Sequence, residues 1–184
     1  MSYDLEDAEG HCLLESQYLL SLKDLNRTEI LEEMLDGGVS SLKIEGRLKG
    51  IDYVRNVTAH YREQLDAIIA RRGEVYHRAS WGRVERQFTP HPERTFSRRF
   101  TSYNIPLHRP IPVDSITPFT NKSVGERIGQ LLECRGREIV IKVEVKETEL
   151  SNGDRLLLVS SDEKETVGAF INQVTPVGKG RYRL

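Results

Sequence analysis

The 184-residue sequence has no long apolar run and no basic, apolar leader. A transmembrane helix needs about 20 consecutive apolar residues, and no segment approaches that length. The first ten residues, MSYDLEDAEG, are acidic, whereas a secretory signal is basic and then apolar. We therefore expect no membrane association and a cytoplasmic location.

Cysteine is almost absent, and the common catalytic motifs are missing. Cys12 and Cys134 lie far apart without a CxxC partner, which argues against a disulfide framework and predicts no metal site made by this chain alone. The five histidines show no HExxH spacing, and no serine lies in a GxSxG elbow. Phosphate-binding P-loop and dinucleotide fingerprints are absent as well.

Charge is balanced overall but unevenly distributed. Residues 1–70 hold 7 Lys and Arg against 14 Asp and Glu, whereas residues 71–109 hold 9 arginines against 3 glutamates. Residues 110–184 hold 11 of each sign. The basic middle segment is suited to a phosphate backbone or to an acidic protein surface.

The first 72 residues predict alternating strands and helices. Residues 3–20 form two strand-like runs around Gly10, which is typical of a hairpin. Ser21 can cap a first turn of a helix that ends at Gly37 and Gly38. Residues 39–45 form a short buried-strand candidate, and apolar residues at helical spacing from Ile51 predict a helix of about five turns.

This order predicts an α+β protein in three parts. Residues 1–72 are expected to be terminal strand–helix units of an incomplete α/β (TIM-like) barrel, because one such unit and a hairpin cannot close a barrel. Residues 73–124, which are rich in proline and aromatic residues, predict an ordered, extended connector. Short alternating runs in residues 125–184, with Ile139 and Ile141 on one face, predict a small antiparallel β-barrel domain that need not be complete.

The segment SLKIEGR holds the candidate catalytic residues. If Leu42 and Ile44 face the helices, Lys43 and Glu45 point into the barrel, and Arg47 lies at the rim where such barrels hold their active sites. A carboxylate there can act as a general base, and an arginine can hold a phosphate or a carboxylate. The alternative is a salt bridge that only neutralises these charges.

The basic segment is a candidate RNA-binding surface because its arginines alternate with aromatic residues, a mixture that grips phosphates and stacks on bases. The alternative is that the aromatic residues dock the connector while the arginines pair with the acidic first segment. The residues that we expect to bind RNA are Arg78, Trp81, Arg83, Arg86, Arg98 and Arg99.

Residues 18–69, from YLLSLKDL through GGVSSLKIEGRLKG to YREQLDAII, closely resemble the core signature of the collagenase-like peptidase family U32. The segment FSRRFTSY is similar to a later family motif, although Arg99 stands where the family usually has glycine and Ser97 where it has asparagine. The subgroup that the chain most resembles contains the ribosomal-RNA cytidine hydroxylation proteins. The resemblance covers residues 1–130 well and the β region more loosely.

The resemblance implies an α/β barrel followed by β domains, with Lys43, Glu45 and Arg47 as family-matched residues of the barrel rim. Some family members are named as proteases, and others act in hydroxylation of RNA or of ubiquinone precursors with an iron–sulfur cluster held by four upstream cysteines. We therefore expect no cofactor in this chain and a cluster only in a full-length relative.

Three functions are consistent with these features. The chain is a family U32 protease or the carboxyl-terminal portion of one, the RNA-binding portion of a cluster-dependent rRNA or tRNA hydroxylation protein, or a truncated relative without catalysis. The expected partners are structured RNA or a protein or peptide substrate. We also expect a homodimer that covers the open edge of the α/β part.

Overall fold

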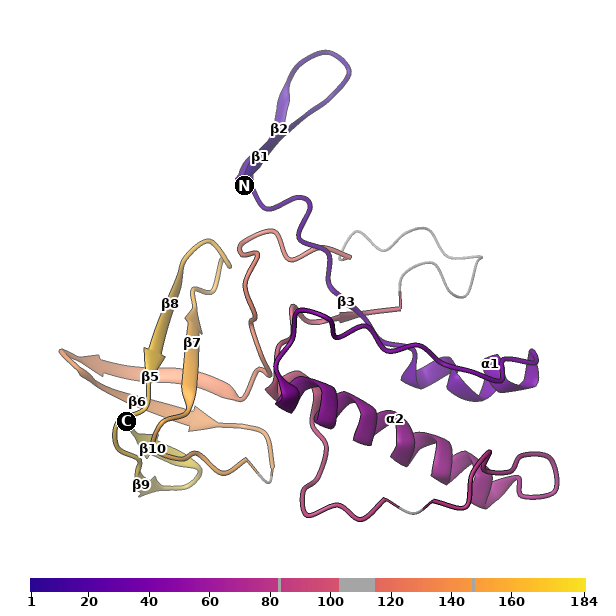
Figure 1. Ribbon diagram of the computed structural model, residues 1–184. Helices are drawn as coiled ribbons and strands as arrows, with labels where there is room; N and C mark the ends of the chain where they lie inside the picture. Colours follow the sequence, from indigo (N-terminus) through magenta and orange to yellow (C-terminus); the bar gives the residue numbers. More distant parts are fainter. Residues whose placement is uncertain (83, 103–114, 147) are drawn as a thin grey trace. The chain divides into compact units, whose positions relative to one another are not determined.

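The computed structural model describes all residues except 83, 103–114 and 147, and it divides into two compact units, Met1–Gly125 and Glu126–Leu184 (Figure 1). The described chain mixes helices with small sheets, as expected for an α+β protein. No closed barrel is formed by these residues, so the α/β barrel stays an expectation.

The first unit carries every helix of the described residues. Its elements in chain order are β1 (Tyr3–Glu6), β2 (Cys12–Gln17), β3 (Asp24–Leu25), a 3-10 turn (Thr28–Ile30), α1 (Leu31–Asp36), α2 (Ile51–Arg71), a second 3-10 turn (Pro92–Arg94) and β4 (Phe100–Thr101). The antiparallel β1–β2 hairpin confirms the predicted one, and Gly10 in its turn has φ +85°, a left-handed conformation that favours glycine.

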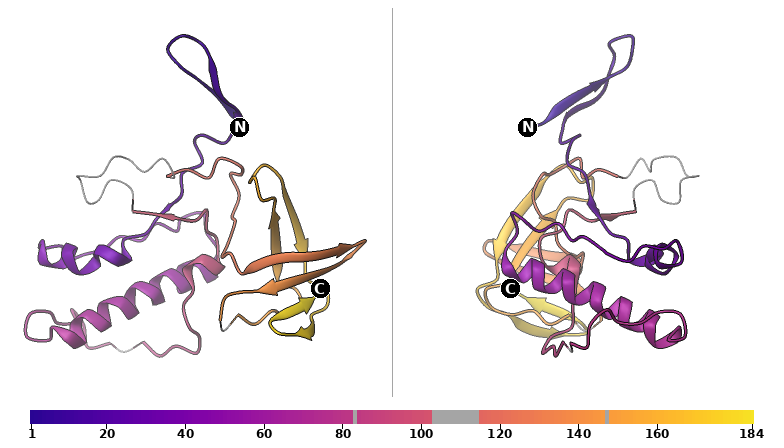
Figure 2. Two further views of the ribbon diagram at one scale, coloured as in Figure 1. Left: turned by 180° about the vertical axis from the view of Figure 1, so that it is seen from behind. Right: turned by 45° about the vertical axis from the view of Figure 1, so that its right-hand side comes forward.

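Helix α2 follows the predicted apolar spacing and buries Val57, Ala59 and Ile68. Helix α1 runs beside the carboxyl-terminal half of α2 (Figures 1 and 2) and buries Leu31, which is only 1% exposed. Arg72, just after α2, donates hydrogen bonds to Glu32 and to Asp36 on α1. Apolar packing and ion pairs therefore both hold the two helices together.

Two expectations for this unit are wrong. Ser21 caps no helix, because the chain continues into β3 and the Ser21 hydroxyl donates instead to the carbonyl oxygen of Thr120. Residues 39–45 form no strand, and within the described part of the chain no neighbouring strand pairs with them. A strand depends on ladder hydrogen bonds to its neighbours, so its sequence pattern alone does not produce it.

The connector contains a strand that the sequence did not reveal. Phe100–Thr101 pairs in parallel with Asp24–Leu25, and the backbone N–H of Asn26 donates to the carbonyl oxygen of Thr101. This pairing joins the connector to the amino-terminal part of the same unit. The extended connector over residues 73–124 stays a prediction, part of which lies outside the described residues.

The second unit contains only strands among its described residues. They are β5 (Gly129–Arg135), β6 (Glu138–Val143), β7 (Arg155–Val159), β8 (Thr166–Phe170), β9 (Thr175–Gly178) and β10 (Arg181–Arg183). Strands β5, β6, β10 and β9 form an antiparallel sheet in this order, whereas β7 and β8 form a separate hairpin. Ile141 of β6 is buried, as the alternation predicted. The antiparallel strands match the expectation, but these strands form an open sheet and a hairpin, not a closed barrel.

Candidate functional site

The candidate catalytic pair Lys43 and Glu45 lies on the surface. Their side chains are 84% and 69% exposed, and Lys43 Nζ lies 2.7 Å from Glu45 Oε1. The hydrogen bond from Lys43 to Glu45, with the attraction of that carboxylate, raises the pKa of Lys43. The structure therefore contains the salt bridge that the sequence left open as an alternative, and a catalytic role for this pair stays a prediction.

Arg47 follows in a tight turn that rests against α2. The backbone N–H of Lys49 donates to the carbonyl oxygen of Gly46 at 2.9 Å. A Cβ atom at Gly46 would lie 3.2 Å from Cγ2 of Val54, so only glycine fits here without displacing that side chain. Arg47 is exposed and makes no hydrogen bond or ion pair with any residue that the structure describes. Its guanidinium group is therefore available to an external phosphate or carboxylate.

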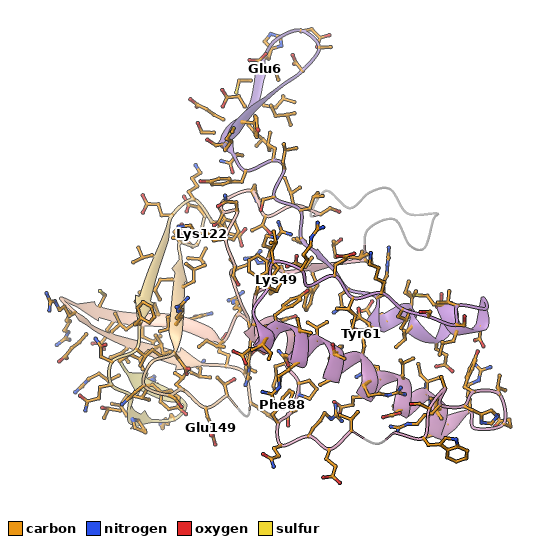
Figure 3. The ribbon with its side chains drawn as sticks, viewed as in Figure 1. Glu6, Lys49, Tyr61, Phe88, Lys122 and Glu149 are labelled. Atoms are coloured by element: carbon orange, nitrogen blue, oxygen red, sulfur yellow. The ribbon has the colours of Figure 1, made fainter. Side chains whose placement is uncertain are left out.

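Lys49 belongs to a mixed cluster of charged and aromatic residues at the start of α2 (Figure 3). Its Nζ atom lies 2.9 Å from the centre of the Phe96 ring, and the guanidinium carbon of Arg98 lies 5.7 Å from the same ring. Arg98 also pairs with Asp24, with Nη2 3.0 Å from Oδ1. Burial lowers the pKa of Lys49, and Arg98 adds to this effect, whereas Asp24 opposes it. We call Asp24, Lys49, Phe96 and Arg98 the Lys49 cluster.

The sequence interpretation overlooked Lys49, although it lies in the same KIEGRLK segment as the three selected residues. The signal that would have identified it is the family pattern itself, in which a lysine follows the arginine by two positions. Its partner Phe96 lies in the distant connector. A contact of this kind has no local sequence periodicity.

The predicted RNA-binding arginines fall into two groups. Arg78 pairs with Asp66, Arg86 with Glu63 and Arg98 with Asp24, which is the pairing with the acidic first segment that was considered as an alternative. Such pairing leaves these guanidinium groups less able to bind phosphate.

The remaining predicted residues are more exposed. Trp81 is fully exposed, and Arg99 lies on the surface above the Phe119 ring, 5.3 Å from its centre. Arg99 has φ +68°, a left-handed conformation that glycine adopts more readily than arginine. Arg83 lies outside the described residues. The RNA-binding role of the whole set stays a prediction.

A groove runs along the first two turns of α2. The amide of Asn56 both donates to the carbonyl oxygen of His91, at 2.6 Å, and accepts from its backbone N–H, at 2.8 Å. These two bonds hold the connector against the helix. The α2 groove has a volume of about 380 Å³ and is lined by Asp52, Arg55, Asn56, Phe88, Thr89, His91, Arg94 and Thr95. This size lies in the range of pockets that bind small ligands, about 300 to 1,000 Å³.

A partly buried polar network lies farther along α2. Tyr61 points from the middle of the helix towards the segment between β3 and α1 (Figure 3), and its hydroxyl group donates to the Asn26 side chain at 3.2 Å. His60 Nε2 lies 2.9 Å from the Thr28 hydroxyl oxygen. Burial lowers the pKa of His60 below its usual value of 6.5, against a smaller opposing effect of Glu63.

Acidification is expected to destabilise the first unit through His60. The unfolded chain takes up a proton near pH 6.5, whereas folded His60 binds it only at lower pH, so the stability present above pH 6.5 is lost as the pH falls. The free energy of unfolding, measured by urea titration with circular dichroism, should therefore be lower at about pH 5.5 than at about pH 7.5. His60→Gln, which does not titrate, should flatten this dependence. An unchanged slope in that variant would contradict the assignment to His60.

Comparison with known proteins identifies the class. The sequence model of peptidase family U32 matches residues 1–111, which include the 39–49 segment, the Lys49 cluster and the α2 groove. This match covers more than half of the chain, and the chain belongs to peptidase family U32. No solved structure matches it.

Individual relatives include both RNA-modifying proteins and a collagenase. The chain is 38% identical to the 23S rRNA 5-hydroxycytidine C2501 synthase of Escherichia coli over 100% of this chain and 27% of the relative. It is 27% identical to a collagenase of Porphyromonas gingivalis over 99% of this chain and 46% of the relative. The tRNA hydroxylation protein P1 of Bacillus subtilis is 38% identical over 37% of this chain and 18% of the relative. The chain thus spans between a quarter and a half of the first two relatives.

The residues of this chain do not fit an iron–sulfur cluster of the four-cysteine type. The sequence contains two cysteines, and Cys12 and Cys134 lie in different units and are both exposed. The described residues also contain no group of three or more His, Cys, Asp or Glu side chains arranged to hold a metal ion. No helix in the described ranges is long and apolar enough to cross a membrane.

Proposed function

We propose that this chain is the RNA-binding portion of a family U32 protein that modifies structured RNA. The observation that carries the proposal is the 38% identity to a 23S rRNA hydroxycytidine synthase over the entire chain, so that both units have counterparts in a protein named for RNA modification. The exposed cationic and aromatic side chains of the first unit are chemically suited to this ligand. They include Arg47, Arg55 and Trp81, all of them on the surface.

In this proposal Arg47, Lys49 and Arg55 contact the RNA backbone, while Arg98 stays paired with Asp24. Lys49 and Arg98 place two positive charges at one ring, and Asp24 neutralises only one of them. Arg47 adds a third cation in the turn that precedes α2. Lys43, Glu45 and Arg47 remain the proposed catalytic residues, and Arg47 is also suited to hold a phosphate or a carboxylate.

The proposal predicts salt-dependent binding of the whole chain to structured RNA. With about three phosphate contacts, the affinity should fall roughly 20- to 40-fold between about 50 and 200 mM salt. Fluorescence polarisation with a labelled hairpin carrying the 23S rRNA sequence around cytidine 2501 measures this slope. Arg47→Gln should flatten it by about one phosphate contact, whereas Arg137→Gln, an exposed arginine in the second unit, should not. Binding that is absent, or independent of salt, would overturn the proposal.

A second candidate is a peptide substrate, favoured by the collagenase that matches 99% of this chain. It predicts cleavage of denatured collagen by the chain, and that cleavage should be lost in Glu45→Gln. A chain that neither binds RNA nor cleaves the peptide would match the third hypothesis, a relative without activity. The proposed homodimer is tested separately by sedimentation, in which a strict monomer would exclude it.

A further inference from the structure

We infer that the α2 groove binds a single unpaired nucleotide, with its base against Phe88 and its phosphate against Arg55. The inference deepens the proposed RNA binding and rests on it for the biological ligand. None of the groove's lining residues was among the predicted RNA-binding set. The groove lies entirely within the first unit.

The groove has two walls that are fixed to each other. One wall is the face of α2 that carries Asp52, Arg55 and Asn56, which share that face because residues three and four apart are neighbours on a helix. The other wall is the connector from Phe88 to Thr95. The paired hydrogen bonds between Asn56 and the backbone of His91 join the walls, and Asn56 is only 8% exposed. The site is therefore preformed, which reduces the entropy lost on binding.

Arg55 supplies the positive charge. It is exposed, and it makes no hydrogen bond or ion pair within the part of the chain that the structure describes. Its guanidinium carbon lies 5.7 Å from the centre of the Phe88 ring, within the range of a cation–π contact, and both side chains line the groove. Arg94 lies on the opposite wall and adds a second positive charge. A planar guanidinium group donates two parallel hydrogen bonds to a phosphate.

Phe88 supplies an aromatic surface. This large apolar side chain lines the groove and leaves 40% of its surface exposed. Bases that are splayed out of a single strand stack on such rings, whereas bases inside a duplex do not reach them. The volume of about 380 Å³ suits one nucleotide better than a helical segment. The ligand chemistry is therefore a single unpaired nucleotide.

Asp52 is the one carboxylate in the lining, and it repels a phosphate while it can accept a hydrogen bond from an amino group. Cytosine, adenine and guanine present an exocyclic amino group, but uracil does not. If the phosphate lies at Arg55, a base that carries an amino group gains a partner at Asp52. The groove should therefore prefer cytidine 5′-monophosphate to uridine 5′-monophosphate.

The test is a titration of the ¹⁵N-labelled 184-residue chain with these two nucleotides and with inorganic phosphate, followed by NMR. Cytidine 5′-monophosphate should shift the backbone amides of residues 52–56 and of the non-proline residues in 88–95, and phosphate alone should shift fewer of them. Arg55→Gln and Phe88→Ala should each weaken nucleotide binding about 10-fold, and Phe88→Tyr should keep it within about 3-fold because the ring is retained. Asp52→Ala should remove the preference for cytidine over uridine because alanine has no side-chain acceptor, and Arg137→Gln should change nothing.

The inference is overturned if the nucleotide shifts amides elsewhere. It is also overturned if Arg55→Gln leaves nucleotide binding unchanged and Phe88→Tyr binds the nucleotide no better than Phe88→Ala. Arg55 is exposed, so its variant keeps the test valid even if Phe88→Ala does not fold. Failure of the RNA hairpin to bind, with the nucleotide shifts intact, would overturn the proposed function alone. Hairpin binding that is unaffected by Arg55→Gln would overturn the groove alone.

Discussion

Alanine in place of Leu31 is expected to lower the free energy of unfolding of the first unit by about 3 kcal/mol. Replacement of a buried leucine by alanine usually costs about 2–5 kcal/mol. Leu31 is 1% exposed at the start of α1, and its removal leaves a cavity as well as a loss of apolar burial. All helices of the described residues lie in the first unit, so circular dichroism at the helical band reports on this unit during urea unfolding.

The matched control is the same substitution at a surface position. Leu48 is 91% exposed in the turn before α2, and Leu48→Ala should change the free energy of unfolding by less than about 0.5 kcal/mol. Equal losses in the two variants would show that Leu31 does not lie in the core. A loss only in the Leu31 variant would show that Leu31 belongs to the core of the first unit.

Asparagine in place of Asp24 is expected to lower the free energy of unfolding by about 2 kcal/mol. Removing one partner of a fully buried ion pair costs about 3–5 kcal/mol, and the loss here is smaller because these side chains keep some solvent contact. The Asp24 carboxylate accepts from the backbone N–H of Arg98 at 2.8 Å and from its Nη2 at 3.0 Å. It is 19% exposed, and Arg98 Nε is already a buried donor without a partner in the described residues. Loss of the negative charge would leave the Arg98 guanidinium uncompensated beside Lys49.

A double-mutant cycle distinguishes this pair from two independent effects. Asp24→Asn combined with Arg98→Gln should lose less stability than the sum of the single variants, because each single change already removes the interaction. Glu85→Gln, the same loss of charge at an exposed position, should be nearly neutral. If the loss in the double variant equals the sum of the two single losses, the ion pair contributes nothing to the free energy of unfolding.

The elements that could be predicted from the sequence are those defined by neighbouring residues. Apolar residues three and four apart predicted α2, and Gly10 predicted the turn of the β1–β2 hairpin. These signals are local, since each lies within one helix face or one turn. The same is true of β6, in which alternation placed Ile141 on the buried face.

The elements that could not be predicted depend on distant partners. Residues 39–45 have the pattern of a strand, but a strand forms only beside another strand. Conversely, β3 and β4 are too short for a periodic pattern, and they exist because they pair with each other. A sequence pattern records which face of a strand is apolar, but it does not record which strand lies beside it.

In the candidate site too, the features defined by neighbouring residues could be predicted and those that depend on distant partners could not. The charges in SLKIEGR and in the arginine-rich connector were visible, and the sequence left open whether they were paired with each other. The structure pairs Lys43 with Glu45 and Arg98 with Asp24. Lys49 and Arg55 were missed because their aromatic partners, Phe96 and Phe88, lie in the connector.

The parallel pairing of β3 with β4 also determines when the first unit can fold. Asp24 and Arg98, which stabilise this pairing, are 74 residues apart in the chain. Closing so long a loop is entropically unfavourable and slow compared with the formation of a helix or a hairpin. A growing chain on the ribosome can form the β1–β2 hairpin and turns of α2 early, but it cannot complete this unit until the connector has emerged. The connector is thus the last piece of the first unit to arrive, and its synthesis sets the moment at which the helices gain their final support.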